Sequence, residues 1–417
     1  MTAHPAPDDV TPDRRTRHDH PLEGPPLVLK FGGSAFADLD GYHRVARYAV
    51  RRLVTQRRPL VLVVSAMSGT TGRLKQTLDT LVDDPPADAA AMLLTTGETV
   101  SVALLAAALD AEGVRARPLP AAGTGLLAEG PPDRAHLVEA KATALAEALA
   151  DCPVVVVPGG QAVDADGRTV MLGRNSSDLS AVAAAAALGS GTCELFSDVP
   201  GVCTADPYLV PAARVLDRIG YEGLRRMSRH GAKVVHESAV GWAQREGVRL
   251  LCRPFPWSGT AGEGTEVGAG PAAAAVVVHQ GSDLWRFPSS RERGAAAEGL
   301  RAGGLAVTEF DTEGAQCLTV PAGARGAAVH LRGARRLDGL CLVTVLDADD
   351  GAEHRVVPRA RAADEARRCH AALYPPPAGD TPREPAAPAL KARSAQSDVL
   401  VGGWEPPRPY GENDCPQ

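Results

Sequence analysis

Short apolar runs alternate with amphipathic or alanine-rich stretches through the first two thirds of the chain. Apolar runs of this length are typical of buried strands, and the stretches between them have helical periodicity. The predicted strands cover residues 27–31, 60–66, 154–157, 193–199 and 248–255, and the predicted helices cover 38–56, 89–112, 132–150, 178–190 and 231–246. Strands that alternate with helices favour a three-layer α/β domain with a central, mostly parallel sheet.

A second pattern follows the glycine-rich stretch 258–270, which we interpret as a linker. Further apolar runs surround one predicted helix at about 291–302, and this mixture favours a smaller α+β region. These runs are AAAVVVH, LAVTEF, AQCLTVP, GAAVHL and LCLVTVLDA. The predicted domains are therefore residues 26–258 and residues 270–372.

Both ends of the chain differ in composition from these domains. Residues 1–25 are rich in proline, aspartate, arginine and histidine, and residues 375–417 contain many prolines with little periodicity. Such segments bury too little apolar surface to offset the entropy of ordering, so we predict that both tails are disordered. The N-terminal segment has no apolar core, so the sequence does not predict a signal peptide.

Composition and charge narrow the classes of function. The 417 residues carry a formal net charge of −6, so no basic surface is predicted that would attract nucleic acid or an anionic membrane. No apolar stretch reaches about 18 residues without a charge or a Gly/Pro break, and we expect no membrane span. The eight cysteines lack the spacing of metal sites, and a disulfide framework is not expected in a chain of this size. We therefore expect reduced thiols in a cytoplasmic protein.

The segment KFGGSA brings a lysine and two glycines to the end of the first predicted strand. Gly32 and Gly33 let backbone N–H groups approach an anion, and Lys30 supplies positive charge for a transferring phosphoryl group. The segment fits neither a Walker A motif nor a dinucleotide fingerprint. A tight turn with a lysine that extends to solvent remains the alternative.

Two further segments place polar groups beside apolar elements. VVSAMSGTTGRL (63–74) presents hydroxyls and free amides at the edge of the predicted sheet, although such Ser/Thr-Gly clusters are more often simple turns. In LLTTGETVS (93–101), Glu98 lies within an apolar helix. A buried carboxylate is costly unless it is paired, so we expect a cationic partner for Glu98, either structural or the ammonium of a substrate.

The segment LGRNSSDLSAVAAAAAL (172–188) carries charged residues at the start of an alanine-rich helix. Arg174 can bind a carboxylate through two hydrogen bonds. Asp178 is either an ordinary N-cap or a group that holds two lysines on either side of a γ-phosphate. Farther along, Asp198 ends a predicted strand, and Lys233 adds positive charge near a helix start, where the helix dipole favours anions.

Taken together and in order, six segments resemble those of aspartate kinases, which belong to the amino-acid kinase superfamily. The segments are KFGGS (30–34), VVSAMSGTT (63–71), TGE..S (96–101), LGR..SD (172–178), SDVPGV.TADP (197–207) and GAKVVH (231–236). The resemblance implies the amino-acid kinase fold over roughly residues 27–256. It also implies transfer of the γ-phosphoryl group of ATP to the side-chain carboxylate of L-aspartate or a close analogue, giving an acyl phosphate. The Mg²⁺ would be carried by the ATP phosphates rather than by the protein.

The resemblance further implies a role for each matched residue. Lys30 and Lys233 would neutralise charge on the transferring group, and Asp178 would orient both lysines, as phosphoryl transfer requires. The residues implied to contact phosphate are Gly32, Gly33 and Ser34. Those implied to contact the amino-acid substrate are Thr71, Glu98, Arg174 and Ser177. Those implied to contact the nucleotide are Ser197, Asp198, Asp206 and Lys233. Within the substrate group, Glu98 would hold the ammonium and Arg174 the α-carboxylate.

The chain departs from the family pattern on both sides of this implied site. On the substrate side, Asn175 and Ser176 stand where the family has two glycines, and Gly160 stands where it has a phenylalanine. On the nucleotide side, Cys203 and Tyr208 replace a tyrosine and an arginine. Three hypotheses therefore remain: an aspartate kinase, a kinase of a different amino-acid-like substrate in a specialised pathway, and an inactive metabolite-binding subunit.

The second region resembles the ACT modules that follow aspartate kinase domains and bind feedback amino acids. Its βαββ order fits loosely, but the glycine-rich ligand turn of those modules is not recognisable. We therefore assign no effector to it. We expect this region to serve in dimerisation, giving a homodimer or a higher homo-oligomer.

Overall fold

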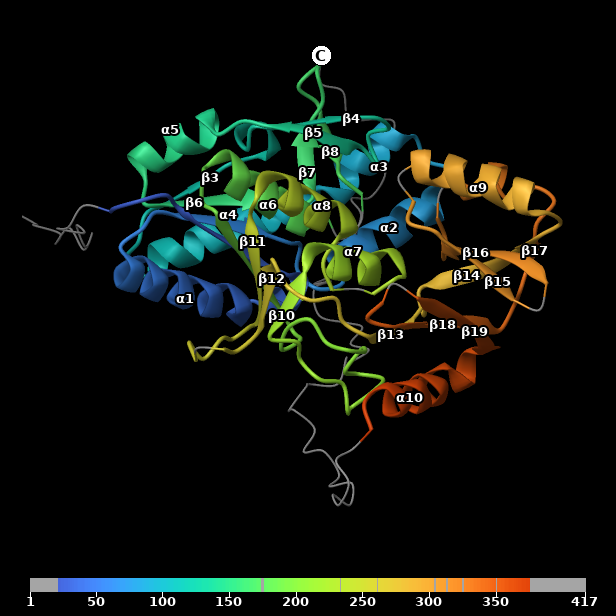
Figure 1. Ribbon diagram of the computed structural model, residues 1–417. Coiled ribbons are helices and arrows are strands. Elements are labelled where there is room, and N and C mark those ends of the chain that lie inside the picture. Colours follow the sequence, from blue (N-terminus) through green and yellow to red (C-terminus); the bar gives the residue numbers. More distant parts are fainter. Residues whose placement is uncertain are drawn as a thin grey trace, which may run out of the picture. The chain divides into compact units, whose positions relative to one another are not determined.

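The computed structural model describes residues 22–173, 176–232, 234–260, 262–303, 305–312, 314–324, 326–349 and 351–375 (Figure 1). All of these residues belong to one compact unit, Met1–Arg383. Three residues that the sequence analysis singles out, Arg174, Asn175 and Lys233, lie outside the described residues. The prediction that both tails are disordered also falls almost wholly outside them.

An eight-stranded sheet forms the centre of the first part of the chain, in the order β10-β12-β11-β9-β1-β2-β6-β3. The strands are β1 (Leu27–Phe31), β2 (Leu60–Val64), β3 (Ala116–Pro118), β6 (Val154–Pro158), β9 (Thr192–Ser197), β10 (Arg218–Gly220), β11 (Arg249–Pro254) and β12 (Thr265–Gly268). All neighbouring strands are parallel except β11 and β12. The prediction of an α/β fold with a mostly parallel central sheet is confirmed.

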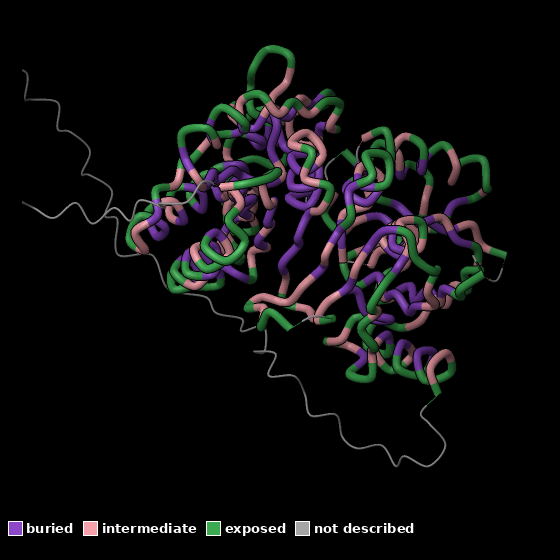
Figure 2. The backbone as a smooth tube through the Cα atoms, turned by 60° about the vertical axis from the view of Figure 1, so that its left-hand side comes forward, coloured by how far each residue is buried: buried purple, intermediate pink, exposed green. Residues whose placement is uncertain are grey.

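Helices cover both faces of this sheet. Val28 and Val61 point into a core shared with α6 (Ser177–Ala187) and α8 (Glu237–Glu246), whereas Leu29 and Leu62 point into a core shared with α1 (Asp40–Gln56) and α4 (Thr96–Ala111). This alternation follows from the period of two in a strand, and it explains why the central strands are apolar throughout. Figure 2 shows the buried residues running through these inner strands. The remaining helices of this part are α2 (Thr70–Leu81), α3 (Ala87–Leu94), α5 (Thr143–Asp151) and α7 (Tyr221–Arg229).

A second, small sheet has the order β5-β4-β7-β8. Its strands are β4 (Leu126–Glu129), β5 (His136–Ala140), β7 (Gln161–Val163) and β8 (Thr169–Met171). The hairpin of β7 and β8 begins directly after β6, so it places Gln161 close to the end of the central sheet. The prediction of one helix over 132–150 is wrong in its first half, because residues 136–140 pair with β4 as a strand.

The later part of the chain is smaller and rich in strands. Its two sheets have the orders β13-β18-β19 and β15-β16-β14-β17. The elements are β13 (Ala275–Val278), β14 (Ser282–Phe287), α9 (Ser290–Ala302), β15 (Thr308–Thr312), β16 (Ala315–Pro321), β17 (Arg335–Arg336), β18 (Leu340–Leu346), β19 (Ala352–Pro358) and α10 (Ala362–Leu373). The succession β14, α9, β15 and β16 has the predicted βαββ order.

The sequence analysis missed several features of this later part. It assigned no element to β14, β19 or α10, and it predicted a strand at GAAVHL where the structure has the short 3-10 helix Ala327–Val329. The glycine-rich stretch interpreted as a linker contributes β12, the strand that pairs with both β10 and β11. A four-residue strand among glycines is too short to show periodicity, so its pairing decides its conformation.

Two predicted helices have different bounds in the structure. The stretch 89–112 divides into α3 and α4 at Thr95, whose hydroxyl donates to the carbonyl of Ala91 at 2.7 Å, a type of bond that often bends a helix. The stretch predicted as a helix over 231–246 becomes helical only at Glu237. Gly231 has a φ of +89°, and residues 234–236 form a loop before α8.

The stretch Ala87–Ala111 is long and apolar enough to cross a membrane, by length and composition alone, with a mean hydropathy of 1.6. It is the one such stretch in the described part of the chain, and 44% of its apolar 18-residue window is buried. Val102, Leu105 and Leu109 of α4 pack into the core beneath the central sheet. A buried core helix passes the same test, so the stretch is weak evidence for a membrane span.

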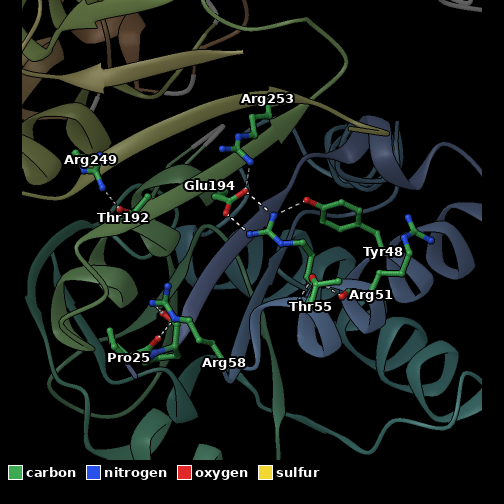
Figure 3. A network of polar contacts seen from close by, with 11 residues as sticks. Pro25, Tyr48, Arg51, Thr55, Arg58, Thr192, Glu194, Arg249 and Arg253 are labelled. Atoms are coloured by element: carbon green, nitrogen blue, oxygen red, sulfur yellow. Dashed lines mark hydrogen bonds and ion pairs between the residues drawn. The ribbon is translucent and has the colours of Figure 1, made fainter. Parts of the chain in front are cut away.

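A buried charged network joins α1 to the central sheet (Figure 3). Glu194 of β9 accepts hydrogen bonds from both terminal nitrogens of Arg52, at 2.6 and 3.0 Å, and from Arg253 at 3.0 Å. Arg52 also donates to Tyr48 Oη at 2.7 Å, and the Arg253 guanidinium lies 3.7 Å from the centre of the Trp257 ring. One carboxylate therefore pairs with two guanidinium groups and fixes α1 against β9 and β11.

Candidate active site

The end of β1 and the start of α6 meet in an ion pair. Lys30 Nζ lies 2.7 Å from Asp178 Oδ1, and the two side chains are only 14% and 9% exposed. The other carboxylate oxygen, Oδ2, accepts the backbone N–H of His236 at 3.3 Å. The N-cap position of α6 is Ser176, so Asp178 is not an N-cap and its carboxylate is directed to Lys30. Lys30 does not simply extend to solvent.

The glycine segment after β1 packs tightly against the neighbouring strands. A Cβ on Gly33 would lie 3.1 Å from the carbonyl oxygen of Ala66, and a Cβ on Gly32 would lie 3.4 Å from that of Phe196 and 3.6 Å from Lys30 Nζ. The N–H of Gly32 donates to Phe196 O at 3.1 Å, so Gly32 provides space beside Lys30 rather than a free N–H. Ser34 follows in the short 3-10 helix Gly33–Phe36 and is exposed.

Two hydroxyl groups meet beside the ion pair. Ser65, which directly follows β2, donates to Ser177 Oγ at 3.0 Å, and its N–H donates to the carbonyl of Phe31 at 3.1 Å. The sequence analysis noted hydroxyl groups in the segment that contains Ser65 but did not assign Ser65 to the site. Only the packing of β2 against α6 brings Ser65 to Ser177, so the sequence holds no separate signal for the contact.

Glu98, at the start of α4, is half-buried and bound by neutral groups. Its Oε1 accepts the N–H of Ala66 at 3.3 Å, and its Oε2 accepts Gln161 Nε2 at 3.4 Å. Gln161 is fixed in turn by a 2.7 Å hydrogen bond from the same nitrogen to the carbonyl of Thr95. Burial raises the pKa of the Glu98 carboxyl. No lysine or arginine within the described ranges forms an ion pair with Glu98.

Thr71, from the first turn of α2, lies close to the same region. A Cβ on Gly97 would lie 2.8 Å from Ala66 Cβ and 3.9 Å from Thr71 Oγ1. The absence of a side chain at Gly97 therefore lets the first turn of α4 approach both Ala66 and α2 closely. Gly97 thus faces both Ala66, whose N–H binds Glu98, and Thr71.

The loop that follows β9 brings the nucleotide-side carboxylates together through Tyr208. Tyr208 Oη donates to Asp198 Oδ2 at 2.7 Å, and the Tyr208 N–H donates to Asp206 Oδ1 at 2.9 Å. Ser197 ends β9, and its carbonyl accepts the N–H of Phe255 at 2.8 Å. Cys203 is buried, and burial raises the pKa of its thiol to about 11, so it packs as a neutral side chain.

The sequence-predicted residues therefore gather in three places on the described part of the chain. Lys30, Gly32 and Asp178 meet at the ends of β1 and α6, with Gly33, Ser34 and Ser177 directly adjacent in sequence. Glu98 and Thr71 come together at Gly97, which precedes Glu98 in the sequence and faces Thr71. Asp198 and Asp206 meet at Tyr208, next to Ser197. Arg174 and Lys233 cannot be placed, because they lie outside the described residues.

Comparisons with known proteins point to the same region. Residues 25–253 match the model of the amino acid kinase family. Over 227 residues the chain is 39% identical to an aspartokinase of Thermus thermophilus, covering 54% of this chain and 56% of the relative. Over 230 residues it is 38% identical to an aspartokinase of Mycolicibacterium smegmatis, covering 54% of each. The chain thus spans about half the length of the curated relatives it matches.

Solved structures extend the likeness in fold to most of the chain. The structure of E. coli aspartokinase III in complex with aspartate and ADP superposes with a TM-score of 0.64 at 21% identity, covering 84% of this chain and 99% of that one. Aspartate kinase from Synechocystis superposes with a TM-score of 0.52 at 22% identity, covering 86% of this chain and 71% of that one. At these identities the superpositions report the fold alone.

Proposed function

The chain belongs to the amino acid kinase family, and from that premise we propose that it transfers the γ-phosphoryl group of MgATP to the side-chain carboxylate of L-aspartate or a close analogue. The observation that carries the proposal is the buried Lys30–Asp178 pair at the carboxyl end of β1. The curated relatives matched over this region are named aspartokinases, which supports the choice of reaction.

On the phosphoryl side, the chain supplies charge and position. Lys30 neutralises developing charge on the transferring group, and Asp178 holds its ammonium in place. The N–H of His236 fixes the second oxygen of the same carboxylate. Lys233, three residues before His236, is the second lysine of our proposal, and Gly32, Gly33 and Ser34 are the residues beside the phosphates.

On the acceptor side, we assign the ammonium group of the substrate to Glu98. Its carboxylate is held by an N–H and an amide rather than by a cation of the described chain, so a positive charge from a ligand would complete the site. Thr71 and Ser177 lie on either side of this acceptor site in our proposal. Arg174 would bind the α-carboxylate, so that an α-amino acid meets two groups of opposite charge.

On the nucleotide side, we assign Ser197, Asp198 and Asp206 to the binding of ATP. Mg²⁺ takes oxygen ligands, and the ATP phosphates would supply most of them, with the carboxylates of the loop after β9 offering the same donor type. When bound, MgATP supplies the phosphoryl group. The chain's own residues would bind and orient it.

The organisation of the whole protein is part of the same proposal. Residues 26–258 would form the catalytic domain together with β12, and residues 270–372 an ACT-like domain for regulation or dimerisation. We propose a homodimer or higher homo-oligomer in the cytoplasm. The seven cysteines among the described residues are free and buried.

A second candidate function is a kinase of a different amino-acid-like acceptor. It is favoured by Gly160, which has a φ of +73° and directly precedes Gln161, the partner of Glu98. Where the family has a phenylalanine ring, this chain has Gly160 with the hydroxyl of Ser176 against it, so the wall next to Gln161 differs from that of the family.

Trapping of the product with hydroxylamine separates these candidates. An acyl phosphate reacts with hydroxylamine to give a hydroxamate, which is measured for a panel of acidic amino acids with MgATP. We expect L-aspartate to give the highest kcat/KM. A different amino acid at the top of the panel would favour the second candidate. No hydroxamate with any acceptor, together with no binding of MgATP, would contradict the kinase proposal as a whole.

A further inference from the structure

A buried histidine of the later, strand-rich part lies against the loop between α7 and α8. His279 directly follows β13 and is 3% exposed, and Gly231 opens the loop with a φ of +89°. A Cβ on Gly231 would lie 2.9 Å from His279 Nδ1. The imidazole ring therefore fills the space against this backbone, and glycine is the residue that tolerates both the φ and the close approach.

The same loop ends at the candidate active site. The carbonyl of Val235 accepts the hydroxyl of Ser228 at 2.8 Å, and the N–H of His236 donates to Asp178 Oδ2 at 3.3 Å. Gly231 therefore contacts His279, and its own N–H and that of Ala232 donate to the carbonyls of Ser228 and Met227 of α7, both at 3.0 Å. Five residues after Gly231 along the chain, His236 binds the carboxylate that pairs with Lys30.

His279 is itself held by the strands of the later part. Its Nε2 lies 3.1 Å from Thr344 Oγ1 on β18, and the same hydroxyl lies 3.1 Å from His354 Nδ1 on β19. The His354 ring lies 5.6 Å from that of His230, the residue before Gly231. The three histidines, 230, 279 and 354, therefore surround the start of the loop as one cluster, which we call the histidine cluster.

We propose that His279 is a positioning residue: its ring packs against Gly231, so that the loop keeps the His236 N–H on Asp178 and Asp178 stays directed to Lys30. The inference rests on the proposed function, which makes Lys30 and Asp178 the groups that act on the phosphoryl. It adds a residue outside the matched family region, residues 25–253, to the residues on which turnover depends.

The surroundings keep the histidine cluster neutral. Burial lowers the pKa of His279 to about 3 and that of His230 to about 4, and it also lowers the pKa of His354. The charged groups that face the cluster are Arg226 and Arg229 from α7, Asp311 from β15, and Asp347 beside Arg226. Two arginines and the neighbouring rings oppose a proton on the cluster, so near neutral pH the rings pack as uncharged groups.

Hydrogen exchange on the full chain tests the proposal without reference to activity. The comparison is between wild type, His279→Ala and His330→Ala. His330 is a matched control because its ring lies against Gly299 of α9, a histidine–glycine contact of the same kind that is made within the later part alone. We expect amides of residues 231–236 to exchange at least about tenfold faster in His279→Ala and at the wild-type rate in His330→Ala.

Kinetics test the consequence for the reaction. His279→Ala should lower kcat by about 10- to 100-fold through misplacement of Asp178, with the KM for the amino-acid acceptor changed less than about twofold. His279→Phe keeps a flat ring against Gly231 but loses the bond to Thr344, and it should recover most of kcat. His330→Ala should leave kcat unchanged.

The proposal would be overturned if the amides of residues 231–236 exchanged at the same rate in His279→Ala as in wild type. It would also be overturned if their exchange rate rose equally in His330→Ala. A His279→Phe variant as impaired as His279→Ala would do so too, since the ring packing would then not be the cause. Failure of the proposed function looks different: wild type would form no acyl phosphate, while the exchange comparison would still give its result.

Discussion

The hydroxyl of Ser176 occupies the space that a side chain on residue 160 would need. A Cβ on Gly160 would lie 3.1 Å from Ser176 Oγ, and this hydroxyl is fixed by a 2.7 Å hydrogen bond to the carbonyl of Gly173. Ser176 is only 1% exposed. Gly160 and Ser176, two departures from the family pattern that are separate in the sequence, therefore contact each other in the structure. Gly160 directly precedes Gln161, which binds Glu98.

A double-mutant cycle on this pair should show coupling. Gly160→Ala alone should lower the free energy of unfolding by about 1–3 kcal/mol, because it strains a φ of +73° and crowds Ser176 Oγ. Ser176→Gly should relieve the crowding, so that the double variant loses less than the sum of the singles. Gly189→Ala is the control, with a φ of +64° and nothing within 4 Å of its Cβ. Strict additivity in urea unfolding would contradict the steric link.

Replacement of Lys30 should stop turnover and spare the fold. Lys30→Ala removes the charge beside the transferring phosphoryl and should lower kcat by about 10²-fold or more. Lys75→Ala is the matched control, because Lys75 pairs with Asp79 one turn away on the surface of α2. Steady-state kinetics and circular dichroism check both variants. A kcat near that of wild type in Lys30→Ala would remove Lys30 from the mechanism.

Glu98→Gln should weaken binding of the amino acid rather than chemistry. Loss of the negative charge strands the substrate ammonium, so the KM for the acceptor should rise by roughly 30-fold, about 2 kcal/mol. Since burial raises the pKa of Glu98, acceptor binding to wild type should weaken as the pH falls through that raised value, starting above pH 4.5. The variant should lack this dependence. An unchanged KM in Glu98→Gln would show that the ammonium binds elsewhere.

Glu194→Gln should destabilise the protein without involving the substrate. The change leaves the guanidinium groups of Arg52 and Arg253 buried without their counter-charge, and about 3–5 kcal/mol of unfolding free energy should be lost. Glu112→Gln is the control, because the Arg47–Glu112 pair is 3.5 Å apart and solvent-screened, worth about 0–1 kcal/mol. Equal midpoints of urea unfolding for the two variants would refute a structural role of the network.

Stability should fall in acid through the histidine cluster. In the folded chain the pKa of His279 is about 3 and that of His230 about 4, against 6.5 without burial, so the unfolded chain binds more protons between these values. The free energy of unfolding should therefore decrease as the pH falls from about 6.5 toward 4, by up to about 1.4 kcal/mol per pH unit for each histidine. His279→Phe should make this slope shallower. The same slope in the variant and in wild type would exclude His279 as its source.

Several elements follow directly from local sequence. The strands β1, β2, β6, β9 and β11 can be recognised from their apolar runs, because a strand that is buried on both faces carries apolar residues throughout. The errors lie where the local signal is weak. Residues 136–140 form a strand because β4 offers them a partner, and residues 265–268 do so because β10 and β11 flank them. Whether a segment pairs with a distant strand cannot be recognised from the hydrophobic periodicity of the segment itself.

The sequence by itself determined five adjacent inner strands of the central sheet, the family resemblance and the residue types of the site, because hydrophobic periodicity and short motifs are local properties of the sequence. Only the tertiary structure decided which of these residues meet. Asp178 could have capped its own helix, yet its carboxylate binds Lys30 and the N–H of His236. His279 carried no sequence signal, yet it packs against Gly231. Such contacts depend on how sheets and helices pack in three dimensions, and no local pattern encodes a distance between residues far apart in the chain.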